Sequence, residues 1–155
     1  MRLTVYSDYA LRLMMYLALK GERLSTIAEI AKAYDISKTH LMKITHELAQ
    51  KGLIETVRGR QGGMRLARSA DEIGVGEIVR SCEPDFSIVP CMENNGEIVC
   101  VVQPACVLKR ALGAAAAAFL DVLDGYTLAD LTRPAMPLRR LLALSEPDIH
   151  AGLPS

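Results

Sequence analysis

Residues 25–50 read STIAEIAKAYDISKTHLMKITHELAQ and carry the strongest structural signal in the chain. Apolar side chains recur here at steps of three and four residues, the period of an amphipathic helix, in two separate runs. The first run is Ile27, Ile30 and Ala31, and the second is Leu41, Ile44 and Leu48. Ser25 and Ser37 precede the runs as helix N-caps, and Asp35-Ile36 separates them. Two short helices joined by about three residues have the proportions of a helix-turn-helix.

The flanking segments complete this motif. Upstream, apolar periodicity predicts a helix over residues 7–20, with Ser7 or Asp8 as its cap. Downstream, residues 53–57 and 64–67 are candidate strands, and the turn between them holds three glycines that permit positive φ. A basic hairpin directly after a helix-turn-helix is typical of a wing, although an ordinary solvated turn has the same composition. We therefore expect a mainly α fold with a small β wing: a winged helix-turn-helix.

The outer face of the second helix in the pair carries side chains suited to reading DNA. They are Ser37, Lys38, Thr39, His40 and Lys43. At the start of a recognition helix, short polar groups reach base edges in the major groove, and lysines reach phosphate or guanine. The wing would place Arg58, Arg60 and Gln61 in the adjacent minor groove, where Gly62 and Gly63 let the backbone approach closely. Each residue taken singly is equally typical of a solvated face, so the prediction of double-stranded DNA binding depends on the whole set.

The charge distribution agrees with this interpretation. The chain has 155 residues, 18 Lys+Arg and 18 Asp+Glu, and a formal net charge of +0. Residues 1–68, however, hold 12 basic and 6 acidic side chains, and residues 69–155 hold 6 and 12. An asymmetry of this kind indicates a basic part that meets a polyanion and an acidic part with another task.

The second half predicts a helix, a loop and a longer helix. Residues 74–82 have the helical period, residues 86–104 have no sustained period, and residues 106–123 form one long apolar stripe. The small residues 114–118 would let another helix approach closely, which favours dimerisation over the alternative of intrachain packing. We predict a DNA-binding domain over 1–82, a cysteine-bearing loop over 83–106, a dimerisation helix over 106–132 and a weakly ordered tail over 133–155.

No membrane partner is expected, and the chain is predicted to be cytoplasmic. The longest run without a polar side chain, residues 111–120, is about half of what spans a bilayer, and the N-terminus does not resemble a signal peptide. In the cytoplasm, thiols stay reduced, so the cysteines predict metal or redox chemistry rather than disulfides.

The four cysteines lie within 25 positions of one another. Cys91, Cys100 and Cys106 follow the spacing Cys-x8-Cys-x5-Cys, which lacks the Cys-x2-Cys pairs of zinc knuckles and ferredoxins. A metal or iron-sulfur site, redox-switch thiols and incidental cysteines all stay open on spacing alone. Cys106 begins a helix, whose dipole favours the thiolate. Cys82 falls inside a predicted helix, where we favour a buried apolar cysteine over a fourth ligand.

Three strings carry a resemblance to a known family: MRLT with SDYALR at the N-terminus, ISKTHLMK over 36–43 and VRGRQGGMRL over 57–66. They resemble the winged-helix iron-sulfur regulators, the family that includes NsrR, IscR and RirA, and the similarity covers residues 1 to 132. Glu83-Pro84-Asp85-Phe86, the spaced cysteines and residues 126–131 are most similar to the NsrR branch, whose members are nitric-oxide-sensing repressors.

The resemblance implies a ligand set. Cys91, Cys100 and Cys106 would ligate an iron-sulfur cluster, either 4Fe-4S or 2Fe-2S, and Asp8 matches the acidic residue that in some NsrR proteins completes the ligation from the other subunit. By its position, Asp8 is equally a helix N-cap. The IscR branch has a histidine three residues after its last cysteine, where this chain has Lys109.

The sequence therefore predicts a homodimeric repressor of a palindromic operator that loses DNA affinity when nitric oxide attacks its cluster. An iron-availability or redox-responsive regulator, like RirA or IscR, is the alternative within the family. A structural zinc module on a DNA-binding protein is a further one. An enzyme is not expected, because the sequence has no nucleotide-binding glycine motif and no cluster of histidines and carboxylates for acid-base chemistry.

Overall fold

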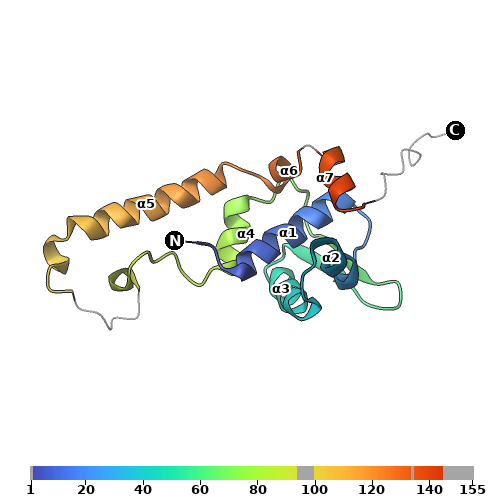
Figure 1. Ribbon diagram of the computed structural model, residues 1–155, viewed down its shortest axis with the longest axis horizontal. Helices are drawn as coiled ribbons and strands as arrows, with labels where there is room; N and C mark the ends of the chain where they lie inside the picture. Colours follow the sequence, from blue (N-terminus) through green and yellow to red (C-terminus); the bar gives the residue numbers. More distant parts are fainter. Residues whose placement is uncertain (1, 94–99, 134, 145–155) are drawn as a thin grey trace.

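A computed structural model of the chain describes residues 2–93, 100–133 and 135–144. The winged-helix part runs α1 (Val5–Lys20), α2 (Ile27–Tyr34), α3 (Lys38–Gln50), β1 (Ile54–Val57), β2 (Gly63–Leu66) and α4 (Val75–Cys82). There follow two short 3-10 turns, η1 (Pro90–Met92) and η2 (Gln103–Ala105), and then α5 (Val107–Asp124), α6 (Leu128–Leu131) and α7 (Ala135–Leu141). The predicted fold class, mainly α with a small β wing, is confirmed (Figure 1).

The wing is an antiparallel hairpin joined to the start of α2. Ile54 pairs with Leu66 and Val57 with Gly63. Ser25 and Met64 exchange two backbone hydrogen bonds, of 2.9 and 2.8 Å, which tie β2 to the residues before α2. A Cβ at Gly63 would lie 2.8 Å from the carbonyl oxygen of Ser25, so this junction requires glycine. The wing is therefore fixed to the helix-turn-helix.

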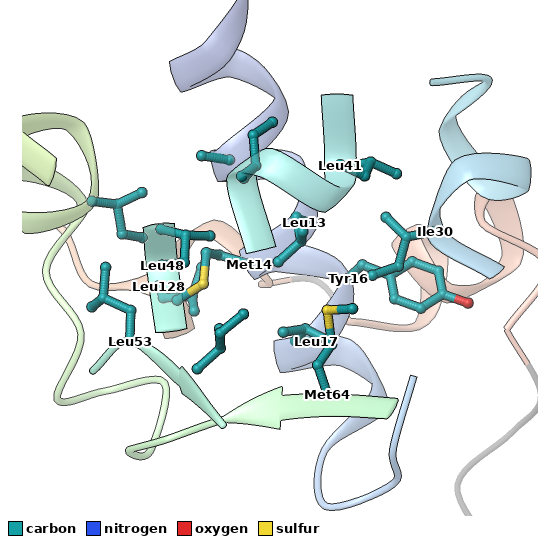
Figure 2. Close-up of a cluster of buried hydrophobic side chains, with 14 of the residues drawn as sticks. Leu13, Met14, Tyr16, Leu17, Ile30, Leu41, Leu48, Leu53, Met64 and Leu128 are labelled. Atoms are coloured by element: carbon teal, nitrogen blue, oxygen red, sulfur yellow. The ribbon is translucent and has the colours of Figure 1, made fainter. Parts of the chain in front are cut away.

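The hydrophobic core surrounds α1 (Figure 2). Leu13, Met14 and Leu17 are fully buried there. Buried side chains reach α1 from α2, α3, the wing and α6; they include Ile30, Leu41, Leu48, Met64 and Leu128. The apolar run predicted for α3 faces inward, since Leu41, Ile44 and Leu48 are all buried; in α4, Val75, Ile78 and Val79 are buried as well. This packing fixes α3, the predicted recognition helix, relative to α1.

Two helix starts differ from the predictions. The N-cap of α1 is Thr4, whose hydroxyl accepts the N–H of Ser7, and neither Ser7 nor Asp8 serves as the cap. The N-cap of α2 is Thr26, which forms a reciprocal capping box with Glu29. Ser25 cannot serve there because its backbone is committed to the bridge with Met64. Helix α3 begins directly after Ser37, as predicted, although the Ser37 side chain makes no capping hydrogen bond.

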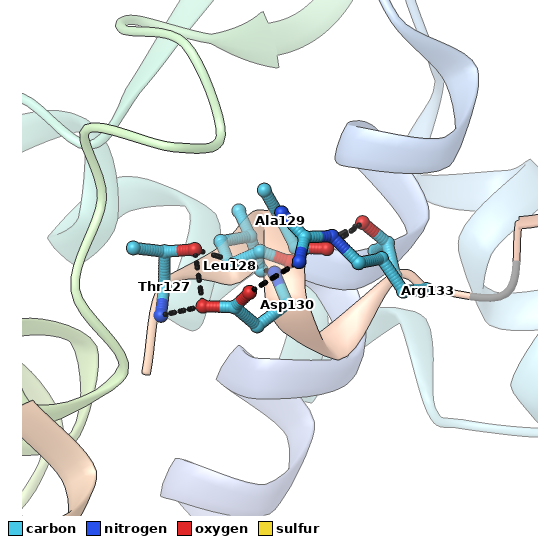
Figure 3. A network of polar contacts seen from close by, with 6 residues as sticks. Thr127, Leu128, Ala129, Asp130 and Arg133 are labelled. Atoms are coloured by element: carbon cyan, nitrogen blue, oxygen red, sulfur yellow. Dashed lines mark hydrogen bonds and ion pairs between the residues drawn. The ribbon is translucent and has the colours of Figure 1, made fainter. Parts of the chain in front are cut away.

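Helix α5 extends away from the body of the molecule, and α6 returns to it (Figure 1). Ala116 is the buried residue of α5, whereas Val107, Leu108 and Val122 are more than 60% exposed. After α5, Thr127 and Asp130 cap α6 reciprocally, with Thr127 N–H donating to Asp130 Oδ2 at 2.9 Å (Figure 3). Leu128 then enters the core beside α1.

The prediction of a weakly ordered tail is wrong for residues 135–141, which form α7. Arg139 is buried and donates a hydrogen bond to the carbonyl of Leu19, and Leu142 and Leu144 pack against the core. These apolar contacts give the segment a place on the body that its Pro- and Arg-rich composition did not suggest. The rest of the predicted tail, residues 145–155, lies outside the described residues.

Leu128→Ala tests the return of the chain to the core. The side chain is fully buried, so truncation is expected to lower the free energy of unfolding by about 2 to 5 kcal/mol. Leu141→Ala is the control, because Leu141 is 82% exposed and its loss is expected to cost less than about 0.5 kcal/mol. Urea unfolding followed by circular dichroism measures both, and equal stabilities for the two variants would contradict the packing of α6.

Candidate DNA-binding surface and cysteine loop

The predicted DNA-reading residues of α3 lie together on its free face. Ser37, Lys38, Thr39, His40 and Lys43 are all exposed. The opposite face of the same helix is fixed by Leu41 and Ile44, which are completely buried. Among the described residues, Lys38 and Lys43 form no ion pair with a carboxylate, so both charges are available to phosphate.

Two tyrosines of α1 contact this face, and the sequence analysis did not identify them. The rings of Tyr9 and His40 have centroids 6.1 Å apart, and Lys43 Nζ lies 5.8 Å from the centroid of the Tyr6 ring. Burial, together with Glu47, raises the pKa of Tyr6 above its ordinary value, so its hydroxyl keeps its proton. The i, i+3 spacing of the tyrosines beside Asp8 was the available signal. They place α1 directly behind the recognition residues.

The wing presents Arg58, Arg60 and Gln61 as exposed side chains at its tip. Its turn is tight: Gly59 has a φ of 115°, and Gly62 N–H donates to the Gly59 carbonyl at 3.0 Å. A Cβ at Gly62 would lie 2.2 Å from the carbonyl oxygen of Val57, so Gly62 is required by the turn itself. Arg65, on β2, differs from the tip arginines because it pairs with Glu55 at 3.1 Å.

A groove of about 460 Å³ separates α3 from the wing. Its apolar walls include Ile27, Met42 and Val57, and Lys38 lies at its margin. Met42 is 52% exposed on the recognition helix, where the inward residues are fully buried. Sequence analysis missed Met42, although its position between the inward Leu41 and the outward Lys43 is out of phase with the apolar face.

The three spaced cysteines lie around the start of α5. Cys91 is in η1, Cys100 precedes η2 and Cys106 is the N-cap of α5; all are free and partly buried. The Sγ atom of Cys106 accepts the backbone N–H of Lys109 at 3.3 Å. The prediction that Cys106 begins a helix is confirmed.

These cysteines are not gathered into a metal site in this arrangement of the chain. Within residues 2–93, 100–133 and 135–144, no group of three or more His, Cys, Asp or Glu side chains is placed to hold a metal ion. Asp8 lies in the first turn of α1, where its carboxylate pairs with Arg12 at 2.9 Å, so it does not act as the helix cap. The chemistry of the donors nevertheless fits an iron-sulfur cluster, because Cys91, Cys100 and Cys106 are three free thiols within 16 consecutive positions of the sequence.

Cys82 has a different environment. It ends α4, packs against the core and lies near Glu47 and Glu83. Burial, followed by these two carboxylates, raises the pKa of its thiol to about 11. At neutral pH, Cys82 is therefore a protonated thiol, which is a poor metal ligand. This environment supports the interpretation of Cys82 as a core residue.

Glu83 joins the start of the cysteine loop to α1, and the sequence analysis did not assign it this role. Its Oε1 accepts hydrogen bonds from the backbone N–H of Thr4 at 2.8 Å, from the Thr4 hydroxyl at 3.0 Å and from the Ser7 hydroxyl. Ser7 is completely buried and is followed directly by Asp8. The first turn of α1 is thus held at the point where the loop begins.

Comparison with known proteins places this architecture among regulators. Residues 3–134 match the family model Rrf2, described as an iron-dependent transcriptional regulator. The HTH-type transcriptional regulator NsrR of Bacillus subtilis (strain 168) is 47% identical over 148 residues, which cover 94% of this chain and all of that protein.

Two solved structures are similar in fold and in sequence. CymR (YrzC), the global cysteine regulator of B. subtilis, has a TM-score of 0.68 at 32% identity, covering 84% of this chain and 95% of its own. IscR of T. potens has a TM-score of 0.67 at 26% identity, covering 95% and 94%. Among the described residues, no helix is both long and apolar enough to cross a membrane.

Proposed function

The chain belongs to the Rrf2 family of transcriptional regulators, and we propose that it is a homodimeric cytoplasmic repressor whose iron-sulfur cluster senses nitric oxide. One observation carries the proposal: an exposed cationic surface on α3 and the wing is joined, through α1 and α4, to a loop with three free thiols. The NsrR relatives are named as transcriptional regulators, which are not enzymes.

The proposed DNA complex uses both sides of the groove between α3 and the wing. The α3 face, with Thr39, His40 and Lys43, enters the major groove, and Arg58 and Arg60 enter the neighbouring minor groove. One sugar-phosphate strand then passes between them, along the groove lined by Met42 and Val57. Lys38 at the margin meets its phosphates, while Met42 supplies an apolar contact to a sugar or a thymine methyl group.

The proposed dimer forms through α5. Val107, Leu108 and Val122 are exposed on a helix that extends from the body, and residues 114–118 are all alanine. Exposed apolar surface on such a helix is stabilised by a second copy of the same helix. The two basic halves of the dimer would then face one palindromic operator.

The residues fit a cluster ligated by Cys91, Cys100 and Cys106, with Asp8 of the second copy as the proposed fourth ligand. When bound, the cluster supplies iron atoms that react with nitric oxide. While the three cysteines are held together, the loop and the start of α5 keep one arrangement relative to α1, through Glu83 and Thr4. Release of the cysteines removes this constraint, so the two recognition helices no longer match both half-sites at once.

The signal has one specific rival. CymR, the global cysteine regulator of B. subtilis, has a similar fold, so the fold itself is compatible with signals other than nitric oxide. An iron-availability or redox regulator would lose its cluster under mild iron chelation in the absence of nitric oxide. The nitric oxide proposal expects a cluster that survives chelation and is lost on exposure to nitric oxide.

Anaerobic purification followed by DNA binding tests the proposed function. We expect a coloured protein with iron and acid-labile sulfide, and about a thousandfold or greater preference for the DNA upstream of its own gene over random duplex at 0.15 M salt. A colourless protein that contains zinc would contradict the proposed iron-sulfur cluster. Equal affinity for both duplexes would contradict the proposal that the upstream DNA contains a specific operator.

A further inference from the structure

Helix α5 is attached to the DNA-binding body at one end. Its C-terminal end lies beside α4 and α6, and its N-terminal end lies far from the winged helix (Figure 1). At the attached end, Val75 N–H donates to the Tyr126 carbonyl at 2.9 Å, and Leu128 N–H donates to the Ile73 carbonyl at 2.8 Å. These backbone bonds hold the residues just after α5. The helix itself contacts α4 and η1, and Phe119 lines a cavity together with Leu3 and Phe86; of these contacts, the one with α4 contains a hydrogen-bonded ion pair.

A two-pronged ion pair links α4 to the last residue of α5. Arg80 Nη1 donates to Asp124 Oδ1 at 2.6 Å, and Nη2 donates to Oδ2 at 2.5 Å. A fork of parallel hydrogen bonds fixes direction as well as distance. Within the described residues, these are the hydrogen bonds between side chains of α4 and α5.

Gly76 makes room for this pair. A Cβ at Gly76 would lie 1.9 Å from Asp124 Oδ1 and 2.8 Å from Arg80 Nη1. The φ of Gly76 is not in the left-handed region, so the effect of a side chain here is local: a Cβ would displace the Asp124 carboxylate or the Arg80 guanidinium from its present position. Gly76 and Arg80 of α4 therefore accommodate the Asp124 carboxylate of α5 at one position.

Small rotations at this contact have large effects at the far end of α5. With 18 residues at about 1.5 Å per residue, the helix is about 27 Å long. A rotation of about 10° at its base moves its far end by about 5 Å, which exceeds the 3.4 Å rise of one base pair. If α5 forms the dimer contact, its angle sets the distance between the two recognition helices.

We propose that Arg80 and Asp124 are positioning residues that set the angle of α5, and thereby the half-site spacing that the dimer accepts. The inference rests on the proposed dimerisation through α5. Both side chains are more than 40% exposed, so the pair adds little to folding stability. Its effect is expected on the half-site spacing that the dimer binds.

The test varies the spacing of two half-sites. The probe is a half-site selected from random duplex DNA by the wild-type protein, placed twice in inverted orientation with the separation changed one base pair at a time. We expect the wild type to bind one spacing at least tenfold more tightly than its neighbours. Arg80→Ala, Asp124→Ala and Gly76→Ala are each expected to reduce that ratio below about threefold.

Several readouts separate positioning from a merely structural role. Single half-site affinity, dimer mass in sedimentation and melting temperature are expected to stay at wild-type values, and the Arg80→Ala/Asp124→Ala double variant should match either single variant. The control is Arg68→Ala, which breaks an equally exposed pair of 2.6 Å between Arg68 and Glu77 that does not involve α5. Its spacing profile should remain that of the wild type.

Wild-type spacing profiles in Arg80→Ala and Asp124→Ala would overturn the inference and leave the proposed function intact. Unfolding or dissociation of these variants would also overturn it, because the pair would then serve folding or assembly. A wild-type protein that is monomeric, or that has no preferred spacing, would overturn the proposed dimer and this inference together.

Discussion

Replacing Cys106 by alanine is expected to give a colourless protein whose operator affinity is about a hundredfold lower. The proposed cluster requires all three cysteines, and without it the two recognition helices are no longer held at one separation. Binding two half-sites together gains a factor of about 10² to 10⁴ over one, so losing that linkage accounts for the decrease. Absorbance, iron content and fluorescence anisotropy on operator DNA measure the three effects.

The control variants separate ligation from helix capping. Cys106 Sγ accepts the Lys109 N–H, so its loss also removes a cap from α5. Cys91 has no such role in α5, and Cys91→Ala is expected to show the same loss of colour and affinity. Cys82→Ala should retain both, because the thiol of Cys82 stays protonated against the core. A coloured Cys91→Ala variant with full affinity would contradict the assigned ligand set.

Replacing Arg58 and Arg60 together by alanine is expected to lower operator affinity at least tenfold and to flatten its salt dependence. Each phosphate neutralised in duplex DNA contributes about −0.9 to the slope of log affinity against log salt. Two arginines on each of two subunits therefore predict a slope that is less steep by about 3 to 4. Anisotropy titrations between 0.05 and roughly 0.3 M salt give this slope.

Arg65→Ala is the matched control for the wing. Arg65 belongs to the same hairpin, but its guanidinium is paired with Glu55 at 3.1 Å and lies behind the tip. Its removal is expected to change the slope by less than one. If the Arg58→Ala/Arg60→Ala variant kept the wild-type slope, the wing would not lie on the DNA.

The winged helix could be predicted because each of its elements has a local signature. The start of α3 and its buried face were predicted correctly from Ser37 and the apolar period, and the glycines marked the turn of the wing. The first residues of the helices were harder to predict from the sequence. Thr4 and Thr26 were passed over for neighbouring polar residues because the bridge from Ser25 to Met64 and the burial of Ser7 are tertiary contacts.

The contacts that link the parts of the molecule were the least predictable. Glu83 meets Thr4 across 79 positions, and Arg80 meets Asp124 across 44. Neither pair leaves a periodic pattern in the sequence. Likewise, α7 docks through Arg139 on the Leu19 carbonyl, which a composition rich in Pro and Arg does not indicate. The ligand roles of Cys91, Cys100, Cys106 and Asp8 remain predictions.

The zero net charge of the chain is explained by this organisation. The basic residues of the first half include the exposed Lys38, Lys43, Arg58 and Arg60, which lie on α3 and the wing. The acidic residues of the second half include Asp124, which pairs with Arg80 of α4, and Asp130, which caps α6. Affinity for DNA is therefore expected to depend on how two basic surfaces are spaced.

The central claim is that nitric oxide controls this spacing through the three cysteines. The most direct measurement is an anaerobic titration of nitric oxide into the protein bound to fluorescent operator DNA, with visible absorbance and anisotropy recorded in the same cuvette. The absorbance of the cluster and the operator-bound fraction are expected to fall together over the same additions of nitric oxide. Undiminished operator binding after complete loss of the cluster absorbance would contradict it.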